Sequence, residues 1–195
     1  GSRLRRDGWN VPKPLVPVGG VTLIEHAVGN LLAAAADPIA ILFNEEEEEC
    51  ERFVREKFAL ALSGRGIDVA LRTTPSSLET LRELSRRLPP GPALFSTVDA
   101  WCPREDFVRF AAEARRFPDA TVLAVTRFVD DERPLWVRRD GDGRVTSVGD
   151  ADGDAVTAGV YRLSRRARER ALAAPAELDR LRAFLRWLVE DGEPV

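Results

Sequence analysis

Several residue types on which catalytic and metal sites depend are scarce in this chain of 195 residues. It has two cysteines, Cys50 and Cys102, and one histidine, His26, which are too few for a zinc site of the usual kind. We expect the cysteines to be reduced thiols and His26 to be structural, within a helix. The sequence offers no Ser–His or Cys–His constellation, which argues against chemistry through an activated protein nucleophile.

Long apolar runs and a strong charge of either sign are also lacking. No run approaches the roughly 20 residues of a membrane-spanning helix, and no secretory signal peptide is recognisable. The net charge of −3 and the isoelectric point near 5.4 argue against nucleic acid or a membrane surface as the main partner. We therefore expect a cytoplasmic protein of ordinary globular composition, for which a homo-oligomer stays open.

Lysine is scarce as well, since Lys13 and Lys57 are the only two among 29 basic residues. Lys13 lies between two prolines, which restrict the backbone and reduce the entropic cost of presenting its ammonium group. Arg3 precedes it in the same loop and can bond two phosphate oxygens at once. The loop therefore suits phosphate binding, with a surface loop of scattered charge as the alternative.

Hydrophobic spacing predicts an α/β fold. A Thr22-x-x-Glu25 capping box begins a helix that extends to about residue 36. Short continuous apolar runs, typical of strands buried on both faces of a parallel sheet, alternate with helical segments. These runs are Ile39–Phe43, Ile67–Leu71, 93–98 and 121–125. We expect a Rossmann-like, doubly wound, mostly parallel sheet. Strand-like segments at 135–138, 144–148 and Ala155–Leu163 add a small antiparallel lobe near the C-terminus.

The glutamates at 45–49 could suggest a metal site. We interpret them instead as the first turn of a helix capped by Asn44, because carboxylates there stabilise the positive end of the helix dipole.

Asp99 is the strongest single metal-binding candidate. It follows the apolar run 93–98 and so lies at the carboxyl end of a strand, where open α/β sheets bind ligands. A carboxylate at that edge suits Mg²⁺, which prefers hard oxygen ligands. An aspartate that merely caps a turn before Cys102-Pro103 is the alternative.

The chain resembles the nucleotide-sugar pyrophosphorylases, the NTP-transferase family. Their signature G-x-G-[ST]-R-[LM], a spacer and P-K-P-L-x-P-V-x-G matches Gly1-Ser2-Arg3 and Pro12-Lys13-Pro14 with its following residues. The resemblance implies that the glycine-rich loop, Gly1 and Ser2 with Arg3, holds the triphosphate and that Lys13 contacts phosphate. Arg3 and Lys13 would thus be the catalytic residues, and Asp99, in a T-V-D context, would bind the catalytic Mg²⁺.

Other motifs resemble a less common branch of this family, in which T-T-P-S-S, T-V-D and D-D-E-[KR]-P-L recur together. By this resemblance the nucleotide is contacted by Thr73, Thr74, Pro75, Ser76 and Ser77. The third motif occupies residues 130–135, with no role beyond a turn. The sugar side would be lined by Thr157, Ala158 and Gly159, where the glycine would allow close approach of the substrate.

The chain departs from the family pattern in three places: it lacks the E-K-P sugar-side motif, the first strand and the final segment with a second metal-binding aspartate. We therefore expect residues 1–195 to form one nucleotidyltransferase-like domain without that strand and that segment. We expect it to bind nucleotide better than it turns over.

The implied reaction joins an NTP to a sugar-1-phosphate, or a similar phosphorylated small molecule, with Mg²⁺, giving an NDP-sugar and pyrophosphate. The substrate phosphate is the nucleophile, so catalysis needs only in-line positioning and charge neutralisation. A non-catalytic or weakly active nucleotide-binding or regulatory relative of the same fold is the alternative. A glycosyltransferase would use a D-x-D motif, which the Ala100-Trp101 that follows Asp99 does not supply.

Overall fold

The computed structural model describes residues 11–64, 66–129, 133–175 and 177–195. The chain divides into two compact units, which we treat separately. The first comprises Gly1–Thr73 and Thr97–Arg109, and the second comprises Thr74–Ser96 and Phe110–Val195. None of the helices in these described ranges combines the length and apolar character needed to cross a membrane.

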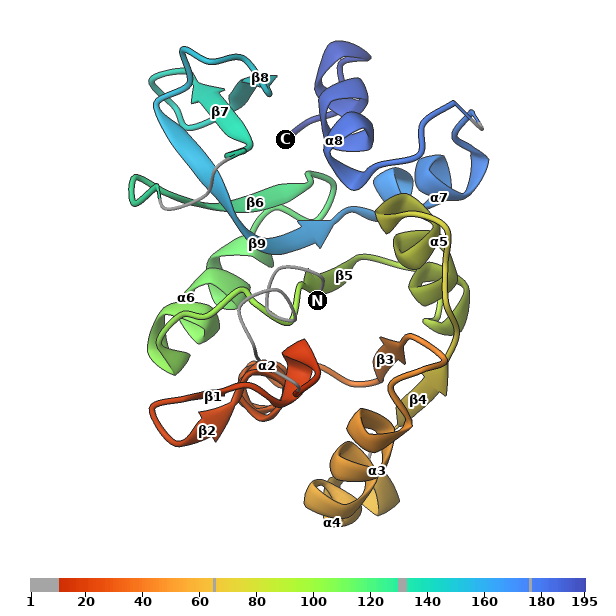
Figure 1. Ribbon diagram of the computed structural model, residues 1–195. Coiled ribbons are helices and arrows are strands. Elements are labelled where there is room, and N and C mark those ends of the chain that lie inside the picture. Colours follow the sequence, from red (N-terminus) through yellow and green to blue (C-terminus); the bar gives the residue numbers. More distant parts are fainter. Residues whose placement is uncertain (1–10, 65, 130–132, 176) are drawn as a thin grey trace. The chain divides into compact units, whose positions relative to one another are not determined.

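The first unit is built on two parallel strands, β3 (Ile39–Phe43) and β4 (Ile67–Leu71), which pair along their full length (Figure 1). A short turn of 3₁₀ helix, η1 (Lys13–Leu15), and the hairpin β1 (Pro17–Val18) and β2 (Val21–Thr22) lead into helix α2 (Leu23–Ala33). Helices α3 (Glu48–Lys57) and α4 (Ala59–Gly64) lie between the two strands in sequence. The core of the first unit consists of Ile24, Val28, Ile39, Ile41, Phe43, Cys50, Val54 and Val69.

One of the two hydrogen bonds of the predicted capping box of α2 is confirmed, the one from a backbone amide to the Thr22 side chain. The Thr22 hydroxyl accepts a hydrogen bond from the Glu25 amide at 3.3 Å. The Glu25 carboxylate is ion-paired with Lys57 of α3, at 3.0 Å. The helix ends at Ala33, earlier than predicted, because Ala35 adopts a left-handed backbone conformation with φ of 55°.

The predicted cap of the next helix is wrong. Asn44 does not cap α3, which begins at Glu48, four residues later. Instead the Glu47 carboxylate accepts hydrogen bonds from the backbone and side-chain nitrogens of Asn44, at 3.0 and 3.1 Å. Burial, reinforced by the charges of Glu47 and Glu49, raises the pKa of the Cys50 thiol to about 12. Cys50 is therefore a protonated core residue rather than a reactive thiol.

The second unit is centred on the nine-residue strand β9 (Ala155–Leu163). It pairs antiparallel with β5 (Ala93–Ser96), β6 (Val122–Thr126) and β7 (Trp136–Arg139), and β8 (Val145–Val148) pairs with β7. Tyr161 pairs with Phe95 on one side and Leu123 on the other, so β9 lies between β5 and β6. The expected α/β fold is confirmed with mixed sheets, since β5 and β6 run in the same direction but are separated by an antiparallel strand.

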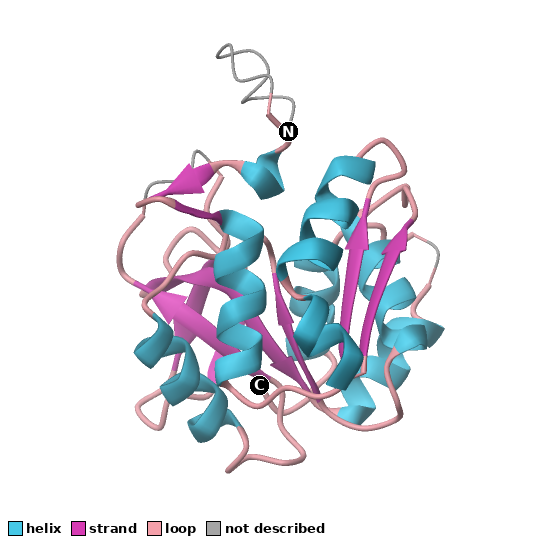
Figure 2. Cartoon of the chain, turned by 90° about the horizontal axis from the view of Figure 1, so that it is seen from below, coloured by secondary structure: helices cyan, strands magenta, loops and turns pink. Residues whose placement is uncertain are grey.

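Helices α5 (Ser77–Arg87), α7 (Arg165–Ala173) and α8 (Leu181–Glu190) bury their apolar faces in the second unit. Figure 2 shows the helices of the chain in cyan and its strands in magenta. Helix α6 (Arg104–Ala114) begins in the first unit and ends in the second. The main buried side chains are Leu78, Leu81, Val137, Val148, Tyr161, Leu163, Phe184, Leu185 and Leu188.

Two buried arginines cap the ends of α5 and α7 reciprocally. Helix α5 is followed by Pro89 and Pro90, which have no N–H for the usual C-terminal cap. Arg168 of α7 instead donates to the carbonyl oxygens of residues at that end, namely Ser85, Leu88, Pro89 and Gly91. Helix α7 is followed by Pro175, and Arg82 of α5 donates to the Ala171 and Ala174 carbonyls. Each helix therefore supplies the donors that the other lacks.

Candidate functional site

The segment that carries Lys13 is held by its neighbours. Pro14 is buried and Leu15 packs against the core of the first unit. The backbone closes the turn with hydrogen bonds from Leu15 to Pro12 at 2.9 Å and from Val16 to Lys13 at 3.2 Å. The predicted proline-restricted loop is thus a single helical turn. It leaves the Lys13 side chain one-third exposed at 33%.

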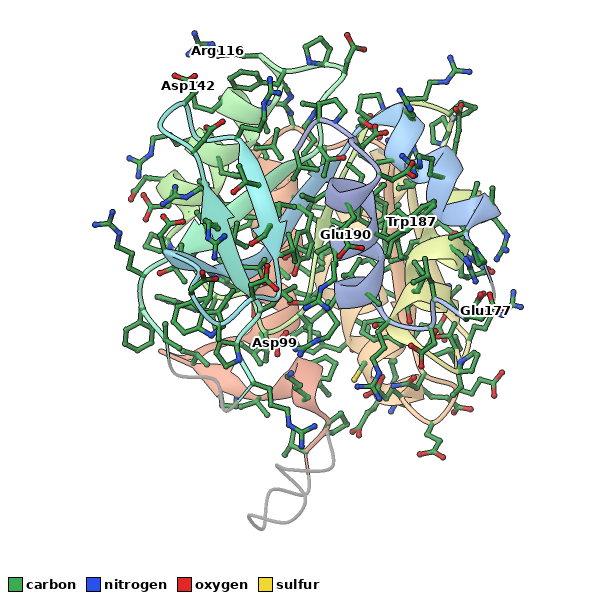
Figure 3. All side chains as sticks on the ribbon, turned by 90° about the horizontal axis from the view of Figure 1, so that it is seen from above. Asp99, Arg116, Asp142, Glu177, Trp187 and Glu190 are labelled. Carbon is green, nitrogen blue, oxygen red and sulfur yellow. The ribbon has the colours of Figure 1, made fainter. Side chains whose placement is uncertain are left out.

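Asp99 lies on a tight turn that follows β5 in the sequence. The Ala100 amide donates to the Thr97 carbonyl at 3.1 Å, and the Trp101 amide donates to the Asp99 carbonyl at 2.8 Å. Val98 packs against the core of the first unit, so the turn is anchored immediately before Asp99. Figure 3 labels Asp99, whose side chain is 49% exposed.

The structure brings Lys13 and Asp99 together. The Lys13 ammonium donates a hydrogen bond to Asp99 Oδ2, and the two groups form an ion pair within the first unit. Partial burial alone would raise the pKa of Asp99, but the hydrogen bond and charge of Lys13, helped by the Thr97 hydroxyl, lower it below 3.8. The carboxylate is therefore ionised at neutral pH.

The donor chemistry at Asp99 is compatible with Mg²⁺. Within the described ranges, no group of three or more His, Cys, Asp or Glu side chains is arranged to hold a metal ion. Mg²⁺ is commonly held by one or two carboxylates, with water and substrate phosphates completing its shell. A single ionised and half-exposed carboxylate fits that requirement.

The hydroxyl of Thr73 joins the carboxyl ends of β3 and β4. Its Oγ1 accepts a hydrogen bond from the Glu45 amide, which follows β3, at 3.1 Å. The Arg72 amide donates to the Phe43 carbonyl at 2.8 Å at the same edge. Thr73 thus has a local structural role in the first unit.

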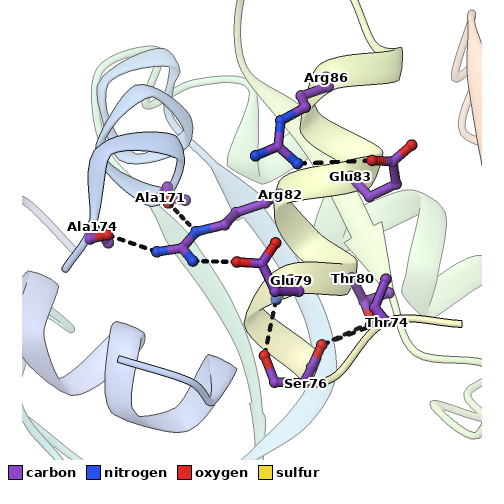
Figure 4. Close-up of polar contacts among 9 residues, drawn as sticks. All are labelled: Thr74, Ser76, Glu79, Thr80, Arg82, Glu83, Arg86, Ala171 and Ala174. Atoms are coloured by element: carbon purple, nitrogen blue, oxygen red, sulfur yellow. Dashed lines mark hydrogen bonds and ion pairs between the residues drawn. The ribbon is translucent and has the colours of Figure 1, made fainter. Parts of the chain in front are cut away.

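The rest of this motif belongs to the second unit and starts α5 (Figure 4). The Ser76 hydroxyl caps the helix by accepting from the Glu79 amide at 3.2 Å. The Thr74 and Thr80 hydroxyls are 2.6 Å apart, and both lie within hydrogen-bonding distance of the Ser76 carbonyl. The Ser77 hydroxyl, after Pro75, accepts from the Leu181 amide at 3.0 Å. In these bonds the hydroxyl oxygens of Ser76 and Ser77 act as acceptors, and their hydroxyl protons take no part.

The predicted sugar-side residues lie in an irregular part of β9. Leu123 of β6 pairs with Tyr161, whereas Val125 pairs with Thr157, so β9 contains extra residues at Ala158 and Gly159. Gly159 has a φ of 76°, a conformation that favours glycine. The backbone alone therefore accounts for this glycine.

Three predicted phosphate-binding residues, Gly1, Ser2 and Arg3, lie outside the described residues, as do residues 130–132. One further contact was not predicted. His26 stacks on Trp101 and lies 2.7 Å from the Cys102 carbonyl oxygen. The only signal in the sequence is the i, i+4 spacing of two polar residues, His26 and Asn30, on a largely apolar helix.

Solved structures of nucleotidyltransferases share this fold. The inositol-1-phosphate CTP transferase from T. maritima superposes with a TM-score of 0.78 at 16% identity, covering 100% of this chain and 79% of that one. A putative glucose-1-phosphate thymidylyltransferase from Bacillus anthracis gives 0.76 at 15% identity, covering 98% and 80%. At these identities the similarity concerns the fold.

Sequence comparison is more specific. The chain is 30% identical over 211 aligned positions to a CMP-5'-(3-aminopropyl)phosphonate synthase from Streptomyces rubellomurinus, with 98% of this chain covered. It spans about a third of that relative's length, 32%. Residues 1–191 match the MobA-like NTP transferase domain. The chain therefore belongs to the MobA-like NTP transferase family.

Proposed function

We propose that this protein is a nucleotidyltransferase that joins an NTP to a small molecule bearing a phosphate or phosphonate group, with Mg²⁺, and releases pyrophosphate. Family membership supports the NTP as one substrate. The name of the Streptomyces relative supports a phosphonate as acceptor and a cytidine nucleotide as donor. Sugar-1-phosphates remain part of the proposed acceptor class.

The observation that carries the proposal is the ion pair between Lys13 and Asp99. Both groups are charged and partly exposed, and neither is a core residue. Exposed ion pairs contribute little to stability, roughly 0–1 kcal/mol, so folding alone gives little reason for this pair. The pairing keeps the carboxylate ionised and the ammonium close to it.

The proposed mechanism uses the two partners separately. An acceptor oxygen attacks the α-phosphorus of the NTP, the bond from that phosphorus to the bridging oxygen breaks, and pyrophosphate leaves with the electron pair. Lys13 turns from Asp99 to the triphosphate, where its charge stabilises the negative charge of the transition state. Asp99 would hold Mg²⁺, which supplies further charge neutralisation when bound. The attacking oxygen belongs to an anionic phosphate or phosphonate, so no protein base is required.

Release of pyrophosphate tests this proposal. The full chain would be incubated with each of the four NTPs, Mg²⁺ and two acceptor panels, one of sugar-1-phosphates and one of aminoalkylphosphonates. We expect release that depends on NTP, Mg²⁺ and an acceptor together. Nucleotide binding without release in any combination would contradict the proposal and favour a non-catalytic nucleotide-binding relative.

A further inference from the structure

His26 contacts the turn after Asp99 in two ways, all within the first unit. Its ring stacks on the indole of Trp101, with centroids 5.2 Å apart and planes inclined by 17°. Its Nε2 lies 2.7 Å from the carbonyl oxygen of Cys102. Because a carbonyl oxygen only accepts hydrogen bonds, this contact is a hydrogen bond in the tautomer that carries the proton on Nε2.

Asn30 reinforces this contact from the next turn of α2. Its side chain is buried, with 1% exposed, and its Nδ2 lies 3.0 Å from His26 Nε2 and 3.5 Å from the same Cys102 oxygen. Asn30 Oδ1 is buried and has no hydrogen-bond partner among the described residues. An orphan amide oxygen is costly, so a leucine would pack there more favourably. The contacts with His26 and with the Cys102 carbonyl therefore account for an asparagine at this position.

The stacking of His26 also holds the side chain of Trp101, which burial alone does not fix. Trp101 remains 52% exposed although it is large and apolar. Val98 anchors the turn on its N-terminal side, and His26 holds it on its C-terminal side through Trp101 and Cys102. Asp99 lies between these two anchors.

Helix α2 supports the Lys13 segment as well. The Leu23 amide at its start donates to the Val16 carbonyl at 3.0 Å, and Leu15 packs against the core cluster to which Ile24 and Val28 contribute. One helix thus holds both chain segments that meet in the ion pair.

We propose that His26 is a positioning residue, which fixes the turn of Asp99 on α2 so that Asp99 and Lys13 keep their relative placement. The kinetic part of this inference rests on the proposed function. A displacement of about 1 Å at reacting groups can reduce a rate roughly a hundredfold, so loss of the anchor should affect kcat more than substrate binding.

Three substitutions separate the two contacts of His26. His26→Gln keeps an N–H donor near the position of Nε2 but removes the ring, His26→Phe keeps the ring without a donor, and His26→Ala removes both. Glu25→Gln is the matched control, because it removes a different contact of α2, the ion pair with Lys57.

Two readouts are measured on the full chain. Hydrogen exchange of the peptide covering residues 97–103, followed by mass spectrometry without ligands, reports the order of the turn. Steady-state kinetics with the NTP and acceptor that support turnover report kcat and KM. The melting temperature of each variant identifies any general loss of stability.

For His26→Ala we expect faster exchange confined to residues 97–103 and a kcat lower by roughly ten- to hundredfold, with the KM for NTP within about threefold. His26→Gln should restore slow exchange and most of kcat, and Glu25→Gln should change neither. Unchanged exchange in both His26→Ala and His26→Phe would overturn the inference, as would a loss that His26→Gln does not restore. If the wild type shows no turnover but the exchange pattern holds, the positioning role stands and the proposed function fails.

Discussion

Lys13 and Asp99 form an ion pair although 86 positions separate them in the sequence. Each is anchored against the core of the first unit, Lys13 through Pro14 and Leu15 and Asp99 through Val98. The two charged groups thus meet without being buried. This arrangement leaves each of them able to exchange its partner for a ligand.

Removing the ammonium group of Lys13 should weaken triphosphate binding more than nucleoside binding. A hydrogen bond to a charged group contributes about 1.5–3 kcal/mol, so Lys13→Met should lower NTP affinity roughly ten- to hundredfold. Lys57→Met is the matched control, because Lys57 is the other lysine and is also ion-paired in this unit. Isothermal titration with NTP and with nucleoside checks this, and equal losses for both ligands would show that Lys13 only supports its loop.

Replacing the carboxylate of Asp99 should remove the Mg²⁺ dependence of NTP binding. Asp99→Asn keeps the volume and removes the charge that attracts the cation. Asp106→Asn is the control, since Asp106 has the same side-chain exposure of 49% and is also ion-paired. In thermal-shift titrations, NTP should stabilise the Asp99→Asn protein equally with and without Mg²⁺. Undiminished magnesium-dependent stabilisation would show that Asp99 is not a ligand.

The pH dependence of the ion pair between Lys13 and Asp99 follows from the direction in which the pKa of Asp99 is shifted. Burial raises its pKa, but the hydrogen bond and charge of Lys13 outweigh burial, so the folded value lies below 3.8. A carboxyl group whose pKa is lower in the folded than in the unfolded protein stabilises the fold at pH values above its unfolded pKa. This stabilisation is lost as the pH falls through the folded pKa. The contribution of Asp99 to stability should therefore stay constant between about pH 5 and about pH 8, which urea denaturation of the wild type and Asp99→Asn across that range checks.

The hydroxyl of Ser76 should matter more for folding than for nucleotide affinity, because its oxygen caps α5. Ser76→Ala should lower the free energy of unfolding by about 1 kcal/mol, the usual cost of losing an N-cap, and change NTP affinity by less than about threefold. Ser164→Ala removes the cap of α7 and provides a comparison without a proposed ligand role. A loss of NTP affinity above tenfold in Ser76→Ala alone would indicate direct nucleotide contact.

Local patterns in the sequence predicted the elements well. The strands Ile39–Phe43, Ile67–Leu71 and Ala155–Leu163 have the predicted bounds, because continuous apolar runs between turn residues define them. The place of β9 was not predictable in this way. An antiparallel strand between β5 and β6 depends on long-range pairing, and the apolar pattern of a strand carries no information about its neighbours.

Two charged residues of the candidate site could also be picked out in the sequence. Lys13 was identified from its place between two prolines and Asp99 from its place at the end of an apolar run, and the structure shows that they meet. The contact of His26 with Trp101 and Cys102 was not foreseen, because it joins residues at least 75 positions apart through a backbone carbonyl that every residue has. The failed cap at Asn44 has a local cause, since α3 begins only at Glu48 and the Asn44 side chain donates to Glu47 instead.

The arginine cap at the end of α5 gives a stability prediction that is independent of the candidate site. Arg168 is buried, and burial lowers the pKa of its guanidinium, which nevertheless stays charged at neutral pH. Arg168→Met would leave the carbonyls of Ser85 and Leu88 without this donor, next to prolines that cannot replace it.

We expect Arg168→Met to lower the free energy of unfolding by roughly 1–3 kcal/mol, the cost of leaving buried acceptors unsatisfied. Arg165→Met is the control on the same helix, because Arg165 is 70% exposed and forms an i, i+4 ion pair with Glu169. That control should change the free energy of unfolding by less than about 0.5 kcal/mol. Urea denaturation of both variants, followed by circular dichroism, measures the difference. Equal effects of the two substitutions would show that the helix end finds other donors, most simply water, and that the reciprocal arginine caps do not stabilise the second unit.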